Sequence, residues 1–333
     1  MKYNYISDIV KASGVQKGEL VLVHFWGEDQ DKEIANLFLA AVTKLGATPV
    51  FLQQARSINN LIFGEATEDC FDENYFEKFS NFDAVLDVFA YQPIVLGYEL
   101  SPAQMKLYRK YIARLFSALM NAKRFTQIRI PTKANAEESG LAPEDYVRRM
   151  EYAYNIDYEM LSLKCGQIIK LYEKNNHYVL CTGDNCQLFF DFTGRKWHID
   201  AGDGDWPCGE VYIAPNETKT HGTVFFDHLF IEDFGEFFNV TLFVEAGVIT
   251  GSSNEEVTKY LHRLPPEETV VCEFGLGMNP NVTDICGYTV LDEKMENSFH
   301  IAIGANDMFG GSNKASRHTD FVNSGCFRLE PLE

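Results

Sequence analysis

The sequence is poor in positive charge. Its 333 residues include 29 Lys and Arg against 48 Asp and Glu, so the formal net charge is −19 with histidine neutral. Nucleic acids and anionic membrane surfaces are bound through clustered Lys and Arg. No basic run offsets the acidic excess here. We therefore expect neither a nucleic acid nor a membrane as a partner.

Long apolar runs and paired cysteines are also missing. No stretch approaches the ~18 apolar residues of a membrane-spanning helix, and the start, Met1-Lys2-Tyr3-Asn4, lacks the apolar core of a secretory signal. The eight cysteines form no Cys-x-x-Cys pair, which argues against a thiolate zinc cage. They are also too sparse for a disulfide scaffold. We expect a cytoplasmic protein with reduced thiols.

The length and the 46% hydrophobic content predict about two domains with sizeable cores. In the first part, strand and helix patterns alternate. Apolar runs predict strands at 20–25, 48–52, 84–89 and 127–131. Helical spacing predicts helices over 31–45 and from Ser101, where Pro102 and Gln104 complete a helix-start pattern. This alternation predicts an α/β domain over 1–135, with an open parallel sheet and covering helices.

The second part has a different texture. Residues 132–144 are small and polar, which indicates a domain boundary, and a long helix is predicted over about 143–174. Short β-like runs punctuated by Gly and Asn follow, at 177–182, 187–192, 209–214, 222–230, 239–246, 269–274 and 298–304. We expect a mixed α+β domain over 143–333.

Histidines and carboxylates of this second part are the candidates for chemistry. His318 and Asp320 stand two residues apart, so in a strand their side chains project from the same face. His300 lies in a strand-like run with small neighbours that leave room for an ion. Glu210 opens another strand, and Glu273 follows an apolar run, where an unpaired carboxylate would be costly to bury. A metal would remove that cost, although a lone histidine in a strand is usually a structural residue and a His-x-Asp pair alone is a weak signal.

Two other patterns are ambiguous or weak. Asp200, Asp203 and Asp205 are compatible with a calcium loop and with an acidic turn, and the distal Glu of a full calcium loop is missing. The pair Gly275-x-Gly277 is too short for a dinucleotide loop.

Several motifs, in one order, resemble the aminopeptidase T family of metallo-aminopeptidases. They are Pro207-Cys208-Gly209-Glu210-Val211 with Ala214-Pro215, His221-Gly222-Thr223-Val224, Glu273-Phe274-Gly275-x-Gly277-x-Asn279-Pro280, Leu291-Asp292-Glu293-Lys294, His300-Ile301-Ala302-x-Gly304, and Gly310-Gly311-x-Asn313 leading to His318-x-Asp320. The resemblance is specific from about 195 to 325 and looser before that.

This resemblance implies a two-metal site in the second domain of a homodimeric enzyme that removes N-terminal residues from peptides. The implied metal ligands are Glu210, Glu273, His300, His318 and Asp320. Carboxylates and imidazoles without thiolates suit Zn, Co, Mn or Fe(II). The candidate general base is Glu210 or Asp307.

One departure leaves alternatives open. The family carries a tyrosine seven residues after its first ligand histidine, and Asp307 stands there in this sequence. An ionised carboxylate cannot donate a hydrogen bond to an oxyanion as a phenol can. A mononuclear Fe(II) ring-cleaving dioxygenase of the dihydroxypyridine dioxygenase type, similar in the Gly-Gly and His-x-Asp region, is one alternative. A catalytically degenerate metal-binding homologue is the other.

Overall fold

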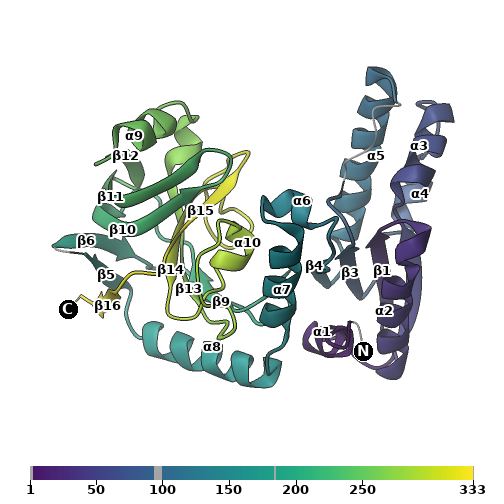
Figure 1. The fold of residues 1–333 in the computed structure, drawn as a ribbon, viewed down its shortest axis with the longest axis horizontal. Helices are drawn as coiled ribbons and strands as arrows, with labels where there is room; N and C mark the ends of the chain where they lie inside the picture. Colours follow the sequence, from purple (N-terminus) through teal and green to yellow (C-terminus); the bar gives the residue numbers. More distant parts are fainter. Residues whose placement is uncertain (1–2, 94–99, 184, 333) are drawn as a thin grey trace. The chain divides into compact units, whose positions relative to one another are not determined.

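A computed structural model describes residues 3–93, 100–183 and 185–332 (Figure 1). The chain forms two compact units, one of residues 1–158 and 202–208, the other of residues 159–201 and 209–333. Compared with the expected ranges 1–135 and 143–333, the first unit also takes in residues 143–158 and the short segment 202–208. Within the described ranges, no helix is both long and apolar enough to cross a membrane.

The first unit is built on a parallel sheet in the order β2-β1-β3-β4-β8. Its strands are β1 (Leu20–Trp26), β2 (Thr48–Gln53), β3 (Ala84–Phe89), β4 (Arg124–Arg129) and β8 (Asp205–Trp206). Its helices are α1 (Ile6–Ala12), α2 (Lys32–Lys44), α3 (Arg56–Glu65), α4 (Glu73–Glu77), α5 (Pro102–Leu119), α6 (Ala136–Ser139) and α7 (Pro143–Tyr154), with a 3₁₀ turn, η1, at Asp29–Asp31. The expected α/β architecture is confirmed.

Local signals explain where these elements begin and what they bury. Ser101 caps α5 by accepting a hydrogen bond from the Gln104 backbone, and the Gln104 side chain accepts one from the Ser101 backbone, which is the predicted capping box. The apolar face of α5, including Ile112 and Leu115, packs into a core with Leu22 and Val85 of the central strands. This burial holds the helix against the sheet.

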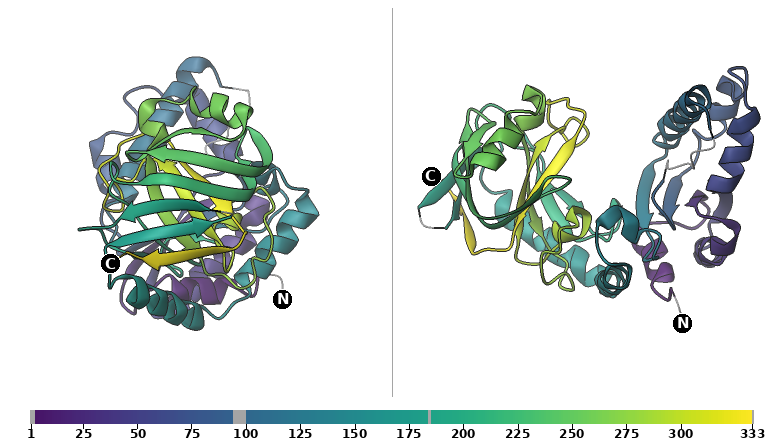
Figure 2. Two further views of the ribbon diagram at one scale, coloured as in Figure 1. Left: turned by 90° about the vertical axis from the view of Figure 1, so that its left-hand side faces the viewer. Right: turned by 45° about the horizontal axis from the view of Figure 1, so that its top comes forward.

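The second unit contains two antiparallel sheets, one six-stranded in the order β12-β11-β10-β6-β5-β16 and one five-stranded in the order β15-β14-β13-β9-β7. Figure 2 shows strands of the first of these side by side. The strands are β5 (His177–Thr182), β6 (Cys186–Asp191), β7 (His198–Asp200), β9 (Glu210–Ile213), β10 (His221–Ile231), β11 (Gly235–Glu245), β12 (Val248–Ser252), β13 (Val271–Gly277), β14 (Phe299–Gly304), β15 (His318–Asn323) and β16 (Phe327–Pro331). The helical segments are α8 (Tyr158–Tyr172), α9 (Glu255–Leu261), η2 (Pro266–Thr269) and α10 (Thr289–Asp292). The mixed α+β class is confirmed.

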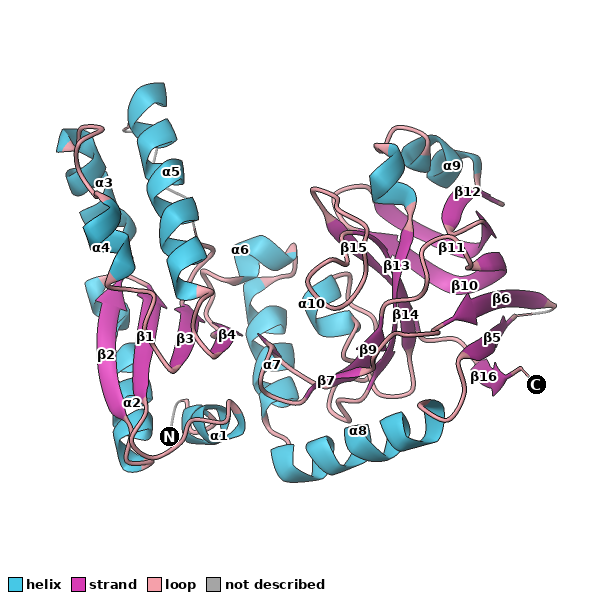
Figure 3. Ribbon diagram, turned by 180° about the vertical axis from the view of Figure 1, so that it is seen from behind, coloured by secondary structure: helices cyan, strands magenta, loops and turns pink. Residues whose placement is uncertain are grey.

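Aromatic rings join the two sheets of this unit. Phe274 of β13 lies 5.1 Å from Phe190 of β6 between ring centroids, and Phe299 of β14 lies 5.8 Å from Phe226 of β10. Because successive side chains of a strand point to opposite faces, Glu273 and His300 project from the other face of the five-stranded sheet. One face of this sheet therefore builds the core, and the other is available for polar groups. Figure 3 shows β9, β13, β14 and β15 of this sheet from behind.

The helix expected over 143–174 is wrong as a single element. Helix α7 ends at Tyr154, Asn155 leaves helical geometry, and α8 starts at Tyr158. The apolar periodicity on both sides is helical, but it does not show that the residues from Asn155 to Asp157 interrupt the hydrogen-bond ladder.

Candidate metal centre

Four neighbouring strands place the predicted ligands on one face of the five-stranded sheet. Ala302 of β14 pairs with both Glu273 of β13 and Asp320 of β15. Two residues along β13 from Glu273, Gly275 pairs with His300, and two residues further along, Gly277 pairs with Glu210 of β9. Residues far apart in sequence therefore meet because antiparallel pairing brings their rows together.

Two groups of side chains have the composition of metal sites and share one member. Glu210, Glu273 and His300 form the first group, and Glu273, His318 and Asp320 form the second. In each group the ligand atoms lie within 4.8 Å of one another. All five predicted ligand residues thus come together, and Glu273 can offer one carboxylate oxygen to each group.

The two imidazoles point their Nε2 atoms at carboxylates. His300 Nε2 lies 3.2 Å from Glu273 Oε1 and 3.4 Å from Glu210 Oε2. His318 Nε2 lies 3.6 Å from Glu273 Oε2 and 3.5 Å from Asp320 Oδ1. A nitrogen lone pair and several carboxylate oxygens converging on one space suit a divalent cation.

Surrounding groups orient these imidazoles. His318 Nδ1 lies 2.9 Å from the Ala305 carbonyl oxygen, so an Nδ1–H can donate there and leave the Nε2 lone pair free, as in many metal-ligating histidines. The β13 strand bulges between Val271 and Glu273, and the Cys272 thiol lies 3.6 Å from the same Nδ1. His300 packs over Gly275, where a Cβ would come within 2.0 Å of Nε2. Gly275 is thus required by packing and not by a nucleotide loop.

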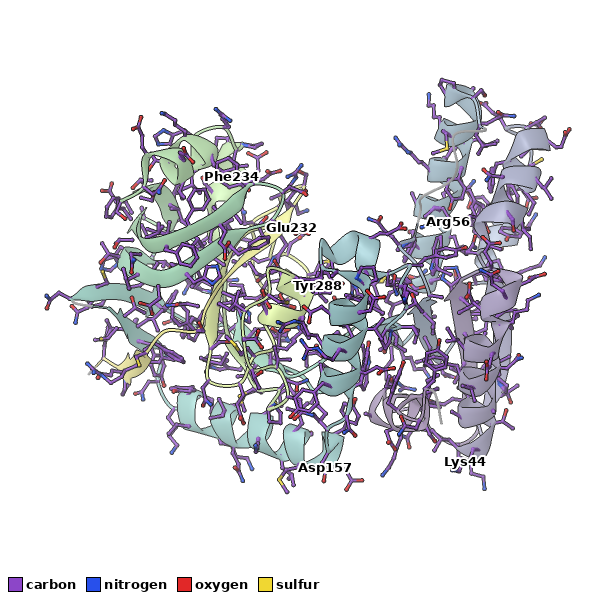
Figure 4. The ribbon with its side chains drawn as sticks, viewed as in Figure 1. Lys44, Arg56, Asp157, Glu232, Phe234 and Tyr288 are labelled. Carbon is purple, nitrogen blue, oxygen red and sulfur yellow. The ribbon has the colours of Figure 1, made fainter. Side chains whose placement is uncertain are left out.

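A buried lysine on this face has no counterpart in the predicted site. Lys294 is 1% exposed. Its Nζ donates to Glu210 Oε1 at 2.5 Å, and it lies 2.8 Å from Glu293 Oε1 and 3.5 Å from Asp200 Oδ2. Helix α10 ends at Asp292, and Glu293 and Lys294 follow it in the chain. Tyr288, labelled in Figure 4, directly precedes the helix. The sequence left open whether Asp200 belongs to a calcium loop or to an acidic turn. In the structure its carboxylate lies near the Lys294 ammonium.

Burial and mutual charge displace the ionisation of this cluster. Burial raises the pKa of Glu210 to about 8 although Lys294 opposes it. Burial lowers the pKa of His300, but its hydrogen bond to Glu273 and the charge of Glu210 outweigh this and bring it to about 9. Burial raises the pKa of Asp320, but the charge of His318 dominates and lowers it to about 2. The carboxylates on this face therefore stabilise a nearby positive charge, such as that of a protonated imidazole.

Asp307 lies apart from these contacts. It is exposed in the loop between β14 and β15, and within the described ranges it makes no hydrogen bond or ion pair with the five ligand residues. The loop is held by its neighbours. Glu217 Oε1 accepts from the Ser312 backbone at 2.6 Å and from Asn306 Nδ2 at 3.2 Å.

An aromatic cluster of His198, Tyr212 and Phe309 borders the predicted ligands. The Tyr212 ring stacks on His198 at 5.2 Å and meets the edge of Phe309 at 5.4 Å between centroids. Phe309 also lies 5.9 Å from the ligand candidate His318. All three are half-buried, so they form the accessible border of the site, whereas Lys294 marks its buried end.

Comparisons with known proteins concern the family and the fold of this chain. The thermophilic metalloprotease (M29) family profile matches residues 8–325. Wild-type AmpT from Thermus thermophilus has a similar structure, with a TM-score of 0.67 and 16% identity over 98% of this chain and 94% of that one. The 2,5-dihydroxypyridine dioxygenase from Pseudomonas putida KT2440 is also similar, with a TM-score of 0.64 and 17% identity over 98% and 92%. No curated protein sequence matches this chain.

The two structural likenesses concern the fold, while the family match spans nearly the whole chain. The family inferred from the motifs is thereby confirmed, and the enzyme class is that of a metal-dependent hydrolase. The chain belongs to the thermophilic metalloprotease (M29) family.

Proposed function

We propose that this protein is an aminopeptidase that releases N-terminal residues from peptides with two divalent ions, Zn, Co or Mn. The ions would be held by Glu210, Glu273, His300, His318 and Asp320. The observation that carries the proposal is the pair of ligand groups joined through Glu273. One shared carboxylate between two groups is the arrangement expected of paired ions.

The charges of the site support two ions over one. Three carboxylates, those of Asp200, Glu210 and Glu293, surround the ammonium of Lys294, and those of Glu273 and Asp320 complete the two ligand groups. When the carboxylates are ionised and the imidazoles neutral, as metal ligation requires, four negative charges remain, which two divalent ions would balance. Burying such an excess without cations would be expensive.

The chain's own residues would bind, orient and shield the reacting groups. When bound, the ions would supply Lewis-acid polarisation of the peptide carbonyl and a more acidic water. Lys294 fixes the Glu210 carboxylate, and the Ala305 carbonyl fixes the His318 ring. Because the charged cluster is buried from the Lys294 side, a peptide would reach it from the side of the aromatic cluster.

The general base is proposed among the two predicted carboxylates, and the contacts favour Glu210. Glu210 belongs to the first ligand group, whereas Asp307 is exposed. If Glu210 is the base, Asp307→Asn keeps nearly full activity. A loss of about 100-fold or more in Asp307→Asn, the size expected for removal of a general base, would assign the role to Asp307.

The deciding experiment counts metal in the purified, reconstituted protein and follows release of N-terminal residues from short peptides. We expect about two ions per chain and peptide hydrolysis. His318→Ala should lose metal and activity while its circular dichroism stays native, and His262→Ala, outside the ligand groups, should keep both.

Other results would overturn the proposal. One iron per chain with oxygen-dependent turnover of a hydroxylated aromatic compound would support the ring-cleaving dioxygenase. A protein that binds no metal on reconstitution would be a degenerate homologue. Full metal content in His318→Ala would refute the ligand assignment.

The assembly and compartment belong to the same proposal: a homodimer in the cytoplasm. All eight cysteines are free, which agrees with reduced thiols. Sedimentation equilibrium should give twice the chain mass of 37.9 kDa, and fractionation of the source cells should place the protein in the cytoplasm.

A further inference from the structure

The Tyr212 side chain occupies a position that the predicted ligand set does not use. On β9, Tyr212 is two residues from Glu210, so both project from the same face of the strand. It pairs with Gly275, which in turn pairs with His300. Tyr212 and His300 therefore stand on either side of a glycine, with backbones about 10 Å apart at the usual strand spacing.

The glycine leaves the space between these two residues open to side chains. The His300 ring fills part of it, because its Nε2 lies where a Gly275 Cβ would be. Tyr212 stands across this glycine on β9, and its side chain is on the same strand face as that of Glu210. The phenol thus belongs to the sheet face that carries the first ligand group, with β13 between its strand and that of His300.

Packing fixes the Tyr212 ring but leaves its hydroxyl unused. His198 stacks on one side and Phe309 meets the ring edge-on. In the part of the chain that the structure describes, the hydroxyl makes no hydrogen bond. A rigidly held phenol with a free O–H, protonated at neutral pH, is a preorganised hydrogen-bond donor.

We propose that Tyr212 is a catalytic residue whose hydroxyl donates a hydrogen bond to the oxygen of the scissile carbonyl. This inference rests on the proposed aminopeptidase function. As the oxygen of water bonds to the carbonyl carbon, the carbonyl π electrons move to its oxygen, where the phenol stabilises the negative charge. When the C–N bond breaks, those electrons return and the leaving nitrogen takes a proton from the attacking water. Tyr212 keeps its own proton throughout and supplies the donor that Asp307 cannot.

The test compares Tyr212→Phe with the wild type and with Tyr260→Phe, a half-buried tyrosine of α9 that stacks on Phe234 outside the site. In the metal-loaded protein, Tyr212→Phe should lower kcat for peptides about 100-fold to 1,000-fold. KM, metal content and Tm should stay close to wild type, because the ring packing is kept. Tyr260→Phe should leave kcat unchanged.

A second readout separates a catalytic role from a structural one. A phosphinic dipeptide, whose tetrahedral oxygens imitate the developing charge, should bind Tyr212→Phe more weakly by a factor similar to the loss in kcat. Calorimetry measures this without turnover.

The outcomes distinguish this inference from the proposed function. An active wild type with an equally active Tyr212→Phe, or with a change in KM alone, overturns the role of Tyr212 and leaves the aminopeptidase proposal standing. A metal-loaded wild type that cleaves no peptide overturns both.

Discussion

Each unit buries a histidine against a carboxylate, but the two pairs differ in their surroundings. In the first unit His24 Nδ1 lies 2.8 Å from Asp87 Oδ1, and both side chains are fully buried. The Trp26 indole donates to the same oxygen at 2.8 Å. In the second unit, His300 faces two carboxylates, and Glu273 faces a second histidine as well.

The difference lies in the balance of charge and hydrogen-bond donors. Asp87 is one carboxylate surrounded by hydrogen-bond donors, so side chains of the protein satisfy its hydrogen-bonding capacity without a metal ion. On the sheet face of the second unit, carboxylates outnumber the cationic side chains. A buried histidine–carboxylate pair is therefore structural where donors suffice, and it indicates a cation site where acids are in excess.

The largest expected effect comes from Glu273→Gln, because Glu273 belongs to both ligand groups. We expect metal content to fall from about two ions to less than one per chain. Peptide hydrolysis should fall by at least about 1,000-fold, since each decade corresponds to about 1.4 kcal/mol of lost transition-state stabilisation. Metal analysis and kcat/KM measure both. The control is Glu268→Gln, a buried acid outside the groups that accepts from Ser316; equal losses in the two variants would contradict the assignment.

Next in size is Lys294→Met, tested by urea unfolding with and without metal. Removing the ammonium from a buried acidic cluster should destabilise the metal-free protein by about 3–5 kcal/mol. Divalent ions would supply positive charge to the same carboxylates, so the loss should be smaller in the metal-loaded protein. Lys164→Met removes an exposed partner of Glu296 and should cost at most about 1 kcal/mol. An equal loss for Lys294→Met in both metal states would show that Lys294 and the ions do not share one charge balance.

The pair of the first unit should respond in the opposite way. Asp87→Asn should cost about 2 kcal/mol of stability, because the hydrogen bonds that Trp26 and Gln127 donate to the ionised carboxylate are weakened and its contact with His24 is lost. Metal content and kcat should not change. Denaturant unfolding and metal analysis of the same preparation test this, with Asp83→Asn as the control, a half-buried aspartate just before β3 that pairs with Lys123. A drop in metal content for Asp87→Asn would break the distinction between the two pairs.

Much of this contrast could be predicted from local sequence. The spacing of His318 and Asp320 placed both on one strand face, and Glu273 stood out because it follows an apolar run. The capping box at Ser101 was equally local. Such signals depend on a few neighbouring residues, and both the strand period and the helix start follow from backbone geometry.

The rest depended on long-range pairing. Lys294 reaches Glu210 across 84 residues of sequence, and no local pattern indicates that a lysine beside acids will be buried. The sharing of Glu273 follows from the register of β13 with β14 and of β14 with β15. Tyr212 likewise gains its place only from its pairing with Gly275. Register is set by tertiary packing, which a single sequence does not display.

The smallest effect concerns Glu217, which supports the loop beside the site through a third kind of pairing, one acid with one guanidinium. Glu217 Oε2 lies 2.5 Å from the Arg195 guanidinium, and Arg195 also donates to the Gly310 carbonyl.

Glu217→Gln should cost about 1.5 kcal/mol at pH 7. Burial raises the pKa of Glu217, but the Ser312 backbone hydrogen bond and Arg195 outweigh it, so its folded pKa is below the usual value. The contribution is thus present above the unfolded pKa of about 4.3 and is lost as the pH falls through the folded pKa. The stability difference between wild type and Glu217→Gln should shrink below about pH 4, whereas Glu330→Gln, in an exposed pair with Arg328, should show little difference at either pH. A difference that persists unchanged at pH 3 would mean that the Glu217 charge does not hold the loop. The acidic excess around Glu273 would then be the one electrostatic feature, among those compared, that distinguishes the second unit from the first.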